Sequence, residues 1–156
     1  MIKEILSLPI VYTSLLYSIP AFIAWKKEKI ILSVLLGFVV IFSFLHRICA
    51  SAKRFMNNNI LHDDTINKLH RLDVAIAITV GWYIVYAVYN GVIYEPDLYY
   101  MTVLLGFLSI CVLWAGTVHK NTKVKDMCHS YWHAMSAFSL CLFILSWEMK
   151  SFLDPQ

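Results

Sequence analysis

A chain of 156 residues, 60% of them hydrophobic and only 15% charged, has the composition of an integral membrane protein. The net charge of +3 comes from basic residues that interrupt apolar segments and form no long block, which excludes a nucleic-acid-binding protein. The four cysteines lack the paired spacing of a disulfide framework, so they do not indicate whether the protein lies in an oxidising or a reducing compartment.

Five apolar segments are long enough to cross roughly 30 Å of hydrocarbon as helices. In chain order they lie near residues 6–25, 30–50, 69–89, 98–118 and 127–147. The third segment follows a polar approach that includes Lys68, and its helix is expected to begin outside the hydrocarbon. The sequence therefore predicts an all-α membrane protein: one helical domain over residues 1–156, built as a bundle of about five transmembrane helices.

Lysine and arginine divide unequally between the two ends of such a bundle. Nine lie on the side that the amino terminus shares with the second and fourth loops: Lys3, Arg47, Lys53, Arg54, Lys68, Arg71, Lys120, Lys123 and Lys125. Four lie on the other side: Lys26, Lys27, Lys29 and Lys150. Because cytoplasmic loops are enriched in Lys and Arg, the amino terminus is expected on the cytoplasmic side, in an organelle or envelope that the sequence does not specify.

Five polar residues fall inside the spans near this basic side. Ser43 and His46 lie near the end of the second span, Asp73 lies near the start of the third, and His129 and His133 lie at the start of the fifth. At about 1.5 Å per residue, each is within roughly 15 Å of the basic-side boundary. Polar groups are costly in hydrocarbon unless they have a partner, so their shared depth predicts one pocket.

The three histidines of this set suit a metal ion. His129 and His133 are four residues apart and share a helix face. With His46 they offer three neutral imidazoles and leave a fourth tetrahedral position to water, which is the open zinc site of a catalytic centre. Asp73 is expected to act as a general base or to orient a ligand. Ser43, one turn before His46, is expected to donate a hydrogen bond to a developing oxyanion or to Asp73.

Each of these residues also has an ordinary structural interpretation. A histidine near a helix end is commonly an interfacial or packing residue, Asp73 could pair with a neighbouring basic residue, and Ser43 could bond its own backbone. Of the remaining histidines, only His70 is retained as an alternate ligand. Cys49 and Cys128 adjoin the histidines, and as membrane cysteines they are interpreted as small packing residues.

The motifs Ser-x-x-His in one span, Leu-Asp-Val-Ala-Ile-Ala at residues 72–77 and His-Ser-Tyr-Trp-His at 129–133 resemble those of the CREST superfamily of membrane hydrolases. That group holds the alkaline ceramidases, the adiponectin and progestin receptors, and proteins related to GPI-anchor processing and to myomaker. Residues 128–140 look closest to the last two branches. The resemblance implies cleavage of the amide or ester bond of a membrane sphingolipid or phospholipid. It implies these site residues: His46, His129 and His133 on zinc, with Asp73 and Ser43 as catalytic groups.

The chain departs from that family in two respects. Family members usually have seven spans where five are predicted here, and their serine more often lies four residues before its histidine, where Ser43 lies three before His46. A bundle with fewer helices has fewer residues to line a lipid pocket. The neighbouring subunit of a homo-oligomer could supply the missing part of the lining.

Two other function classes stay open from the sequence. His46 with His129 or His133 could be axial ligands of a b-type haem in a membrane electron carrier, which an absorption spectrum would reveal by an intense Soret band. Alternatively, a structural zinc ion could stabilise a non-catalytic receptor or membrane-remodelling protein.

Overall fold

The computed structural model describes residues 9–56, 63–90 and 96–147, and within these ranges the regular secondary structure is helical throughout. The first apolar segment forms α2 (Pro9–Thr13), a 3₁₀ turn η1 (Ser14–Tyr17) and α3 (Ser18–Lys26). The others form α4 (Ile30–Met56), α5 (Asp63–Tyr89), α6 (Pro96–Val118) and α7 (Thr122–Ser146). The predicted all-α fold is confirmed, and each of the five predicted segments coincides with a helical stretch.

Among the described residues, three helices are long and apolar enough to cross a membrane: the spans are Ile30–Lys53, Asp63–Tyr89 and Asp97–Val118. The first segment differs because η1 interrupts it. Pro20 lacks a backbone N–H for the carbonyl of residue 16, four positions earlier, which favours a tighter turn there. The amino-terminal half of α7 carries charged residues and both histidines of the predicted pair. The structure therefore supports a membrane protein, and a crossing by α2–α3 or by α7 stays a prediction.

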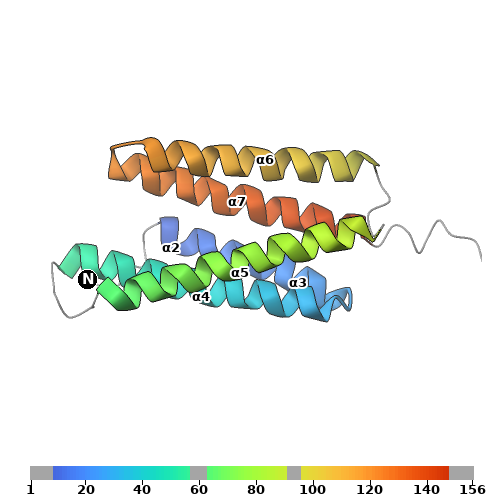
Figure 1. Cartoon of the computed structure of the whole chain (residues 1–156), viewed down its shortest axis with the longest axis horizontal. Helices are drawn as coiled ribbons and strands as arrows, with labels where there is room; N and C mark the ends of the chain where they lie inside the picture. The colour runs from blue at the N-terminus through green and yellow to red at the C-terminus, as the bar shows by residue number, and fades with distance from the viewer. Residues whose placement is uncertain (1–8, 57–62, 91–95, 148–156) are drawn as a thin grey trace, which may run out of the picture.

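The helices form an open array with two antiparallel pairs (Figure 1). α5 packs on α4, α4 packs on the α2–η1–α3 segment, that segment packs on α7, and α7 packs on α6. Within the described residues, α5 makes no close backbone contact with α6 or α7. Cavities lined by side chains of α5, α6 and α7 lie between α5 and the α6–α7 pair.

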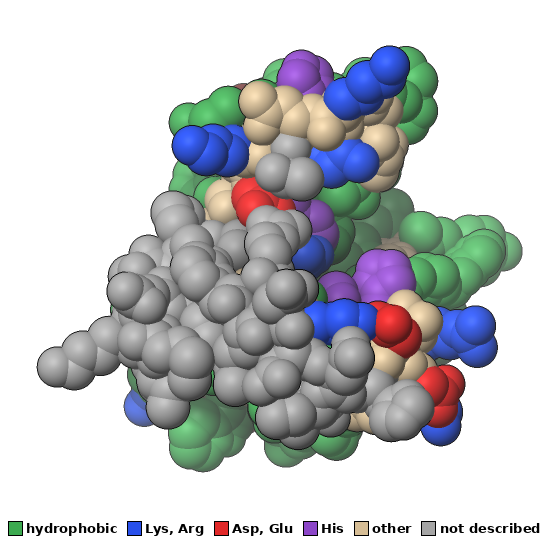
Figure 2. Space-filling view, turned by 90° about the vertical axis from the view of Figure 1, so that its left-hand side faces the viewer, with side chains coloured by type: hydrophobic (Ala, Val, Ile, Leu, Met, Phe, Trp, Pro, Cys, Tyr) green, Lys and Arg blue, Asp and Glu red, His purple; other side chains and the backbone are tan. Residues whose placement is uncertain are grey.

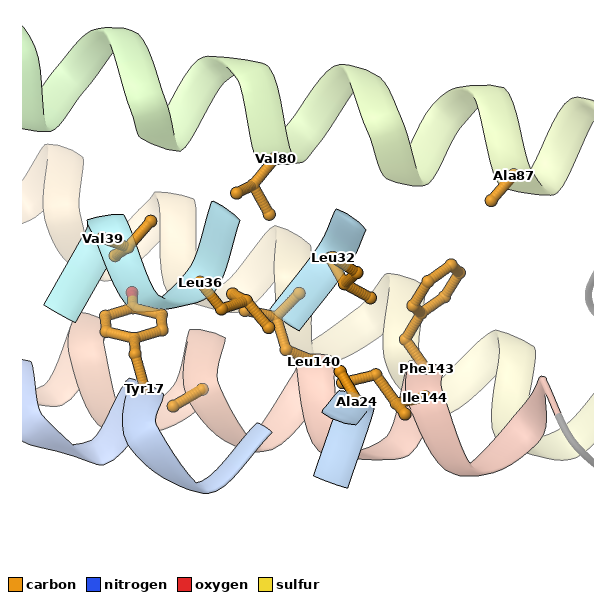
Figure 3. Packing of buried hydrophobic residues seen from close by; sticks show 11 residues of the cluster. Tyr17, Ala24, Leu32, Leu36, Val39, Val80, Ala87, Leu140, Phe143 and Ile144 are labelled. Carbon is orange, nitrogen blue, oxygen red and sulfur yellow. The ribbon is translucent and has the colours of Figure 1, made fainter. Parts of the chain in front are cut away.

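The ends of α4 and α6 and the starts of α5 and α7 lie at one end of the bundle, on the left in Figure 1. This is the end that the second and fourth loops were expected to share. The buried apolar core lies toward the other end, where Leu32 of α4, Ala24 of α3 and Phe143 and Ile144 of α7 are all fully buried (Figure 3). Apolar packing thus holds the far end together, and the polar residues gather at the near end.

Gly116 marks a close approach between α6 and α7. A Cβ atom at this position would lie 2.8 Å from the Cβ of Cys128. We therefore expect Gly116→Ala to push the helices apart and to lower the free energy of unfolding by roughly 1–3 kcal/mol. Unfolding of the purified protein in detergent measures the change.

The matched control is Gly37→Ala, because a Cβ at Gly37 meets nothing within 4 Å. Alanine favours a helix over glycine by up to about 1 kcal/mol, so this variant should be neutral or slightly stabilised. Equal stability of the Gly116→Ala and Gly37→Ala proteins would contradict the close approach.

Candidate metal and catalytic site

Three buried polar side chains meet where α4 packs on α5. Ser43 and His46 lie one turn apart on α4, with exposed fractions of 0% and 7%, and Asp73 of α5 is 8% exposed. The Nδ1 atom of His46 lies 3.9 Å from Oδ2 of Asp73. The Ser43 hydroxyl has no hydrogen-bond partner within the described residues. The structure thus brings together three of the five residues that the sequence singled out.

His70 joins them to complete what we call the α4–α5 cluster: Ser43, His46, His70 and Asp73. It lies three residues before Asp73, so both side chains project from one face of α5. The ring centroids of His70 and His46 are 4.9 Å apart. His46, His70 and Asp73 each offer a ligand atom, and these atoms all lie within 4.8 Å of one another. This set can hold a metal ion, and in the described part of the chain no other set of three such ligands does so.

His129 and His133 of α7 form a second group, the histidine pair. Their ring centroids are 4.5 Å apart, as the four-residue spacing predicts. His133 is only 1% exposed, and neither of its ring nitrogens has a hydrogen-bond partner among the residues described. A buried imidazole without a partner is costly, so these nitrogens fit the role of metal ligands. Zinc ligation by His46, His129 and His133 together stays a prediction.

Arg47 of α4 reaches across to the histidine pair. Its Nη2 atom contacts both ring nitrogens of His129 and lies 3.1 Å from Nδ1. A neutral imidazole has one acceptor nitrogen, and a guanidinium only donates. His129 can therefore bind a metal ion through its acceptor nitrogen only when the Arg47 side chain moves away from it. From the sequence, Arg47 was used only to predict the membrane orientation. Its position next to His46 nevertheless places it at the same level of α4 as that histidine.

Two adjoining cavities connect these groups. The larger, of 680 Å³, is lined by His46, His70 and Asp73 of the α4–α5 cluster and by His129. The smaller, of 290 Å³, has mainly apolar walls and is lined by His133 and again by Asp73. Figure 2 shows this end of the molecule, where histidine side chains lie in a recess with basic and acidic side chains around it. Asp73 thus faces both cavities, between the two histidine groups.

Tyr17 of η1 supports His133 from the opposite side. The two rings pack edge to face with centroids 5.4 Å apart, and Tyr17 is 4% exposed. Ser136 donates to the carbonyl of Trp132 at 2.6 Å, so the Tyr17 hydroxyl donates to Ser136 Oγ at 2.5 Å. The sequence analysis gave Tyr17 no role. No local signal could have found it, because 119 positions separate Tyr17 from Ser136.

The ordinary interpretations of the cluster do not match its contacts. Lys68 pairs with Asp64 at 2.7 Å, whereas Asp73 faces His46. Ser43 makes no hydrogen bond to its own backbone. The Asp73 carboxyl group thus lines both cavities, and the Ser43 hydroxyl is buried without a hydrogen-bond partner among the described residues.

Comparison with models of protein families, with curated proteins and with solved structures found no match. The residues of the site itself are therefore the basis for assigning a function. Its donor set fits a metal ion, because Nδ1 of His46 and both ring nitrogens of His133 are buried without a hydrogen-bond partner in the described structure.

Proposed function

We propose that this protein is a zinc-dependent intramembrane hydrolase that cleaves the amide or ester bond of a long-chain acyl lipid. The observation that carries the proposal is a cluster of buried imidazoles and a carboxyl group at the polar end of an apolar cavity, among helices apolar enough to cross a membrane. His46, His129 and His133 would hold the zinc ion. Zinc would polarise the substrate carbonyl and acidify a water molecule.

The cavities between α5 and the α6–α7 pair would admit the lipid from the side. Apolar residues of four helices line the smaller cavity, among them Leu36, Val80, Ile110 and Leu140. Such walls suit an acyl chain, and the polar groups at one end would fix its orientation. The amide or ester bond of a membrane lipid lies near the headgroup, so it would reach Asp73 and His133 if these residues lie at the shallow depth that the sequence predicts.

Asp73 would take the proton from the attacking water. Its carboxyl group faces both cavities, and its only ion-pair contact within the described residues is with His46. Ser43 would donate a hydrogen bond to the oxyanion that develops on the carbonyl oxygen, or to Asp73, because its hydroxyl group has no hydrogen-bond partner in the described structure. Arg47 would have to release His129 before that ring takes up zinc.

The test combines metal analysis with lipid turnover on the purified full chain in detergent or lipid nanodiscs. We expect about one zinc ion per chain. We also expect hydrolysis within a panel of ceramides and phospholipids of defined acyl length, abolished by a chelator and restored by added zinc. A chain without zinc would contradict the proposal. So would a zinc-loaded chain that releases no fatty acid, which would favour a non-catalytic zinc protein. A His133→Ala protein with unchanged zinc affinity would remove His133 from the ligand set.

A further inference from the structure

Within the described part of the chain, the group of metal-ligating residues whose ligand atoms lie within 4.8 Å of one another contains His70, to which the motif resemblance assigns no role. We propose that His70 binds the metal ion together with His46 and Asp73 beside the larger cavity, in the ligand position that the proposed function gives to His129. One oxygen of the Asp73 carboxylate would bind the metal ion, and the other would remain to accept the proton from water. The inference depends on the metal centre of the proposed function, but it does not depend on lipid hydrolysis.

The geometry of the three donors is close to that of a metal site. Ligand atoms around tetrahedral zinc lie about 3.4 Å apart when the bonds are about 2.1 Å long. His46 Nδ1 and Asp73 Oδ2 are already 3.9 Å apart, and all three donors lie within 4.8 Å of one another. His70 is exposed, so small rotations of its side chain would close the remaining distance without disturbing packed neighbours. Two imidazoles and a carboxylate are a common ligand set for zinc and similar divalent ions.

A second observation shows that the site is directed at a ligand. His46 is 93% buried, and its Nδ1 atom points toward Asp73 at a distance too long for a hydrogen bond. That nitrogen has no hydrogen-bond partner within the described residues. A bridging cation would compensate for the cost of burying it beside a carboxylate.

His70 is also better placed than His129 to stand next to His46. The His70 and His46 rings are in contact with their centroids 4.9 Å apart and are tilted by an interplanar angle of 34°. The ring nitrogens of His129 are instead engaged by Arg47. The alternative is that His70 merely covers His46 as a surface side chain, in which case its removal would leave metal affinity unchanged.

Metal titrations of the full chain in nanodiscs, with a chromophoric chelator as competitor, distinguish the two interpretations. We expect His70→Ala to weaken Zn²⁺ binding by roughly 10- to 100-fold, and to alter the visible spectrum of the Co²⁺-substituted protein because one imidazole ligand is lost. The matched control is His119→Ala, another exposed histidine at the same end of the bundle, just after α6. It should leave both the affinity and the spectrum unchanged.

Wild-type affinity and an unchanged Co²⁺ spectrum in the His70→Ala protein would overturn the inference. If this result came with lipid hydrolysis by the wild-type chain, the proposed function would stand and only His70 would be excluded. If His70→Ala lost affinity and the wild-type chain hydrolysed no lipid, His70 would stand as a ligand and the hydrolase would be wrong. A wild-type chain that bound neither metal ion would contradict both.

Discussion

Replacing Asp73 by asparagine is expected to reduce lipid hydrolysis by about 10²- to 10⁴-fold, the usual contribution of a general base. The amide has nearly the same size as the carboxyl group but cannot accept the proton from water. Asp73 is also one of three donors within 4.8 Å of one another, so zinc affinity should fall together with turnover. Initial rates of fatty-acid release, normalised to bound zinc, measure the catalytic loss separately from the metal loss.

Asp97→Asn is the matched control for this substitution. Asp97 is exposed in the first turn of α6, at the end of the bundle far from the cluster. Its change should leave zinc content and turnover as in the wild type. An Asp73→Asn protein that keeps full turnover per bound zinc would show that another group takes the proton.

Replacing Phe143 by alanine is expected to lower the free energy of unfolding by about 3–5 kcal/mol, because the truncation leaves a cavity in a packed core. Phe143 of α7 is fully buried, and its ring packs edge to face on Trp147 with centroids 5.6 Å apart. It lies in the apolar cluster away from the metal donors (Figure 3). Chemical denaturation in detergent measures the loss, and zinc affinity below the unfolding transition should not change.

Phe138→Ala tests whether position rather than residue type decides this cost. Phe138 lies on the same helix and is 55% exposed. Its truncation should alter stability by no more than about 0.5 kcal/mol. Equal losses for the two phenylalanines would contradict the assignment of Phe143 to the core.

Much of the helical organisation could be predicted from hydropathy alone, although helix ends could not. α4 continues to Met56 and α5 begins at Asp63, beyond the predicted limits of 50 and 69. The predicted limits follow the apolar residues. Backbone hydrogen bonds within a helix do not require hydrocarbon, so both helices extend into polar sequence. The extension of α5 is what places His70 on a regular helical turn with Asp73.

The candidate site was predictable in part. The sequence was sufficient to predict that His129 and His133 share a helix face and that Ser43, His46 and Asp73 belong to one pocket. The partner of His129 was not, because Arg47 is 82 positions away and its contact depends on how α4 faces α7. Helical spacing favours His70 as a ligand, since it lies one turn before Asp73.

By itself, the sequence determined that this protein is helical and suited to a membrane. It also identified the polar residues that need a partner when they lie in hydrocarbon. Composition and helical periodicity carry that information because burial in lipid acts on each segment separately. Only the tertiary structure decided which polar residues meet: His46 with His70 and Asp73, His129 with Arg47, and His133 with Tyr17. Those contacts depend on the rotation and packing of whole helices, which residue spacing along one helix does not specify.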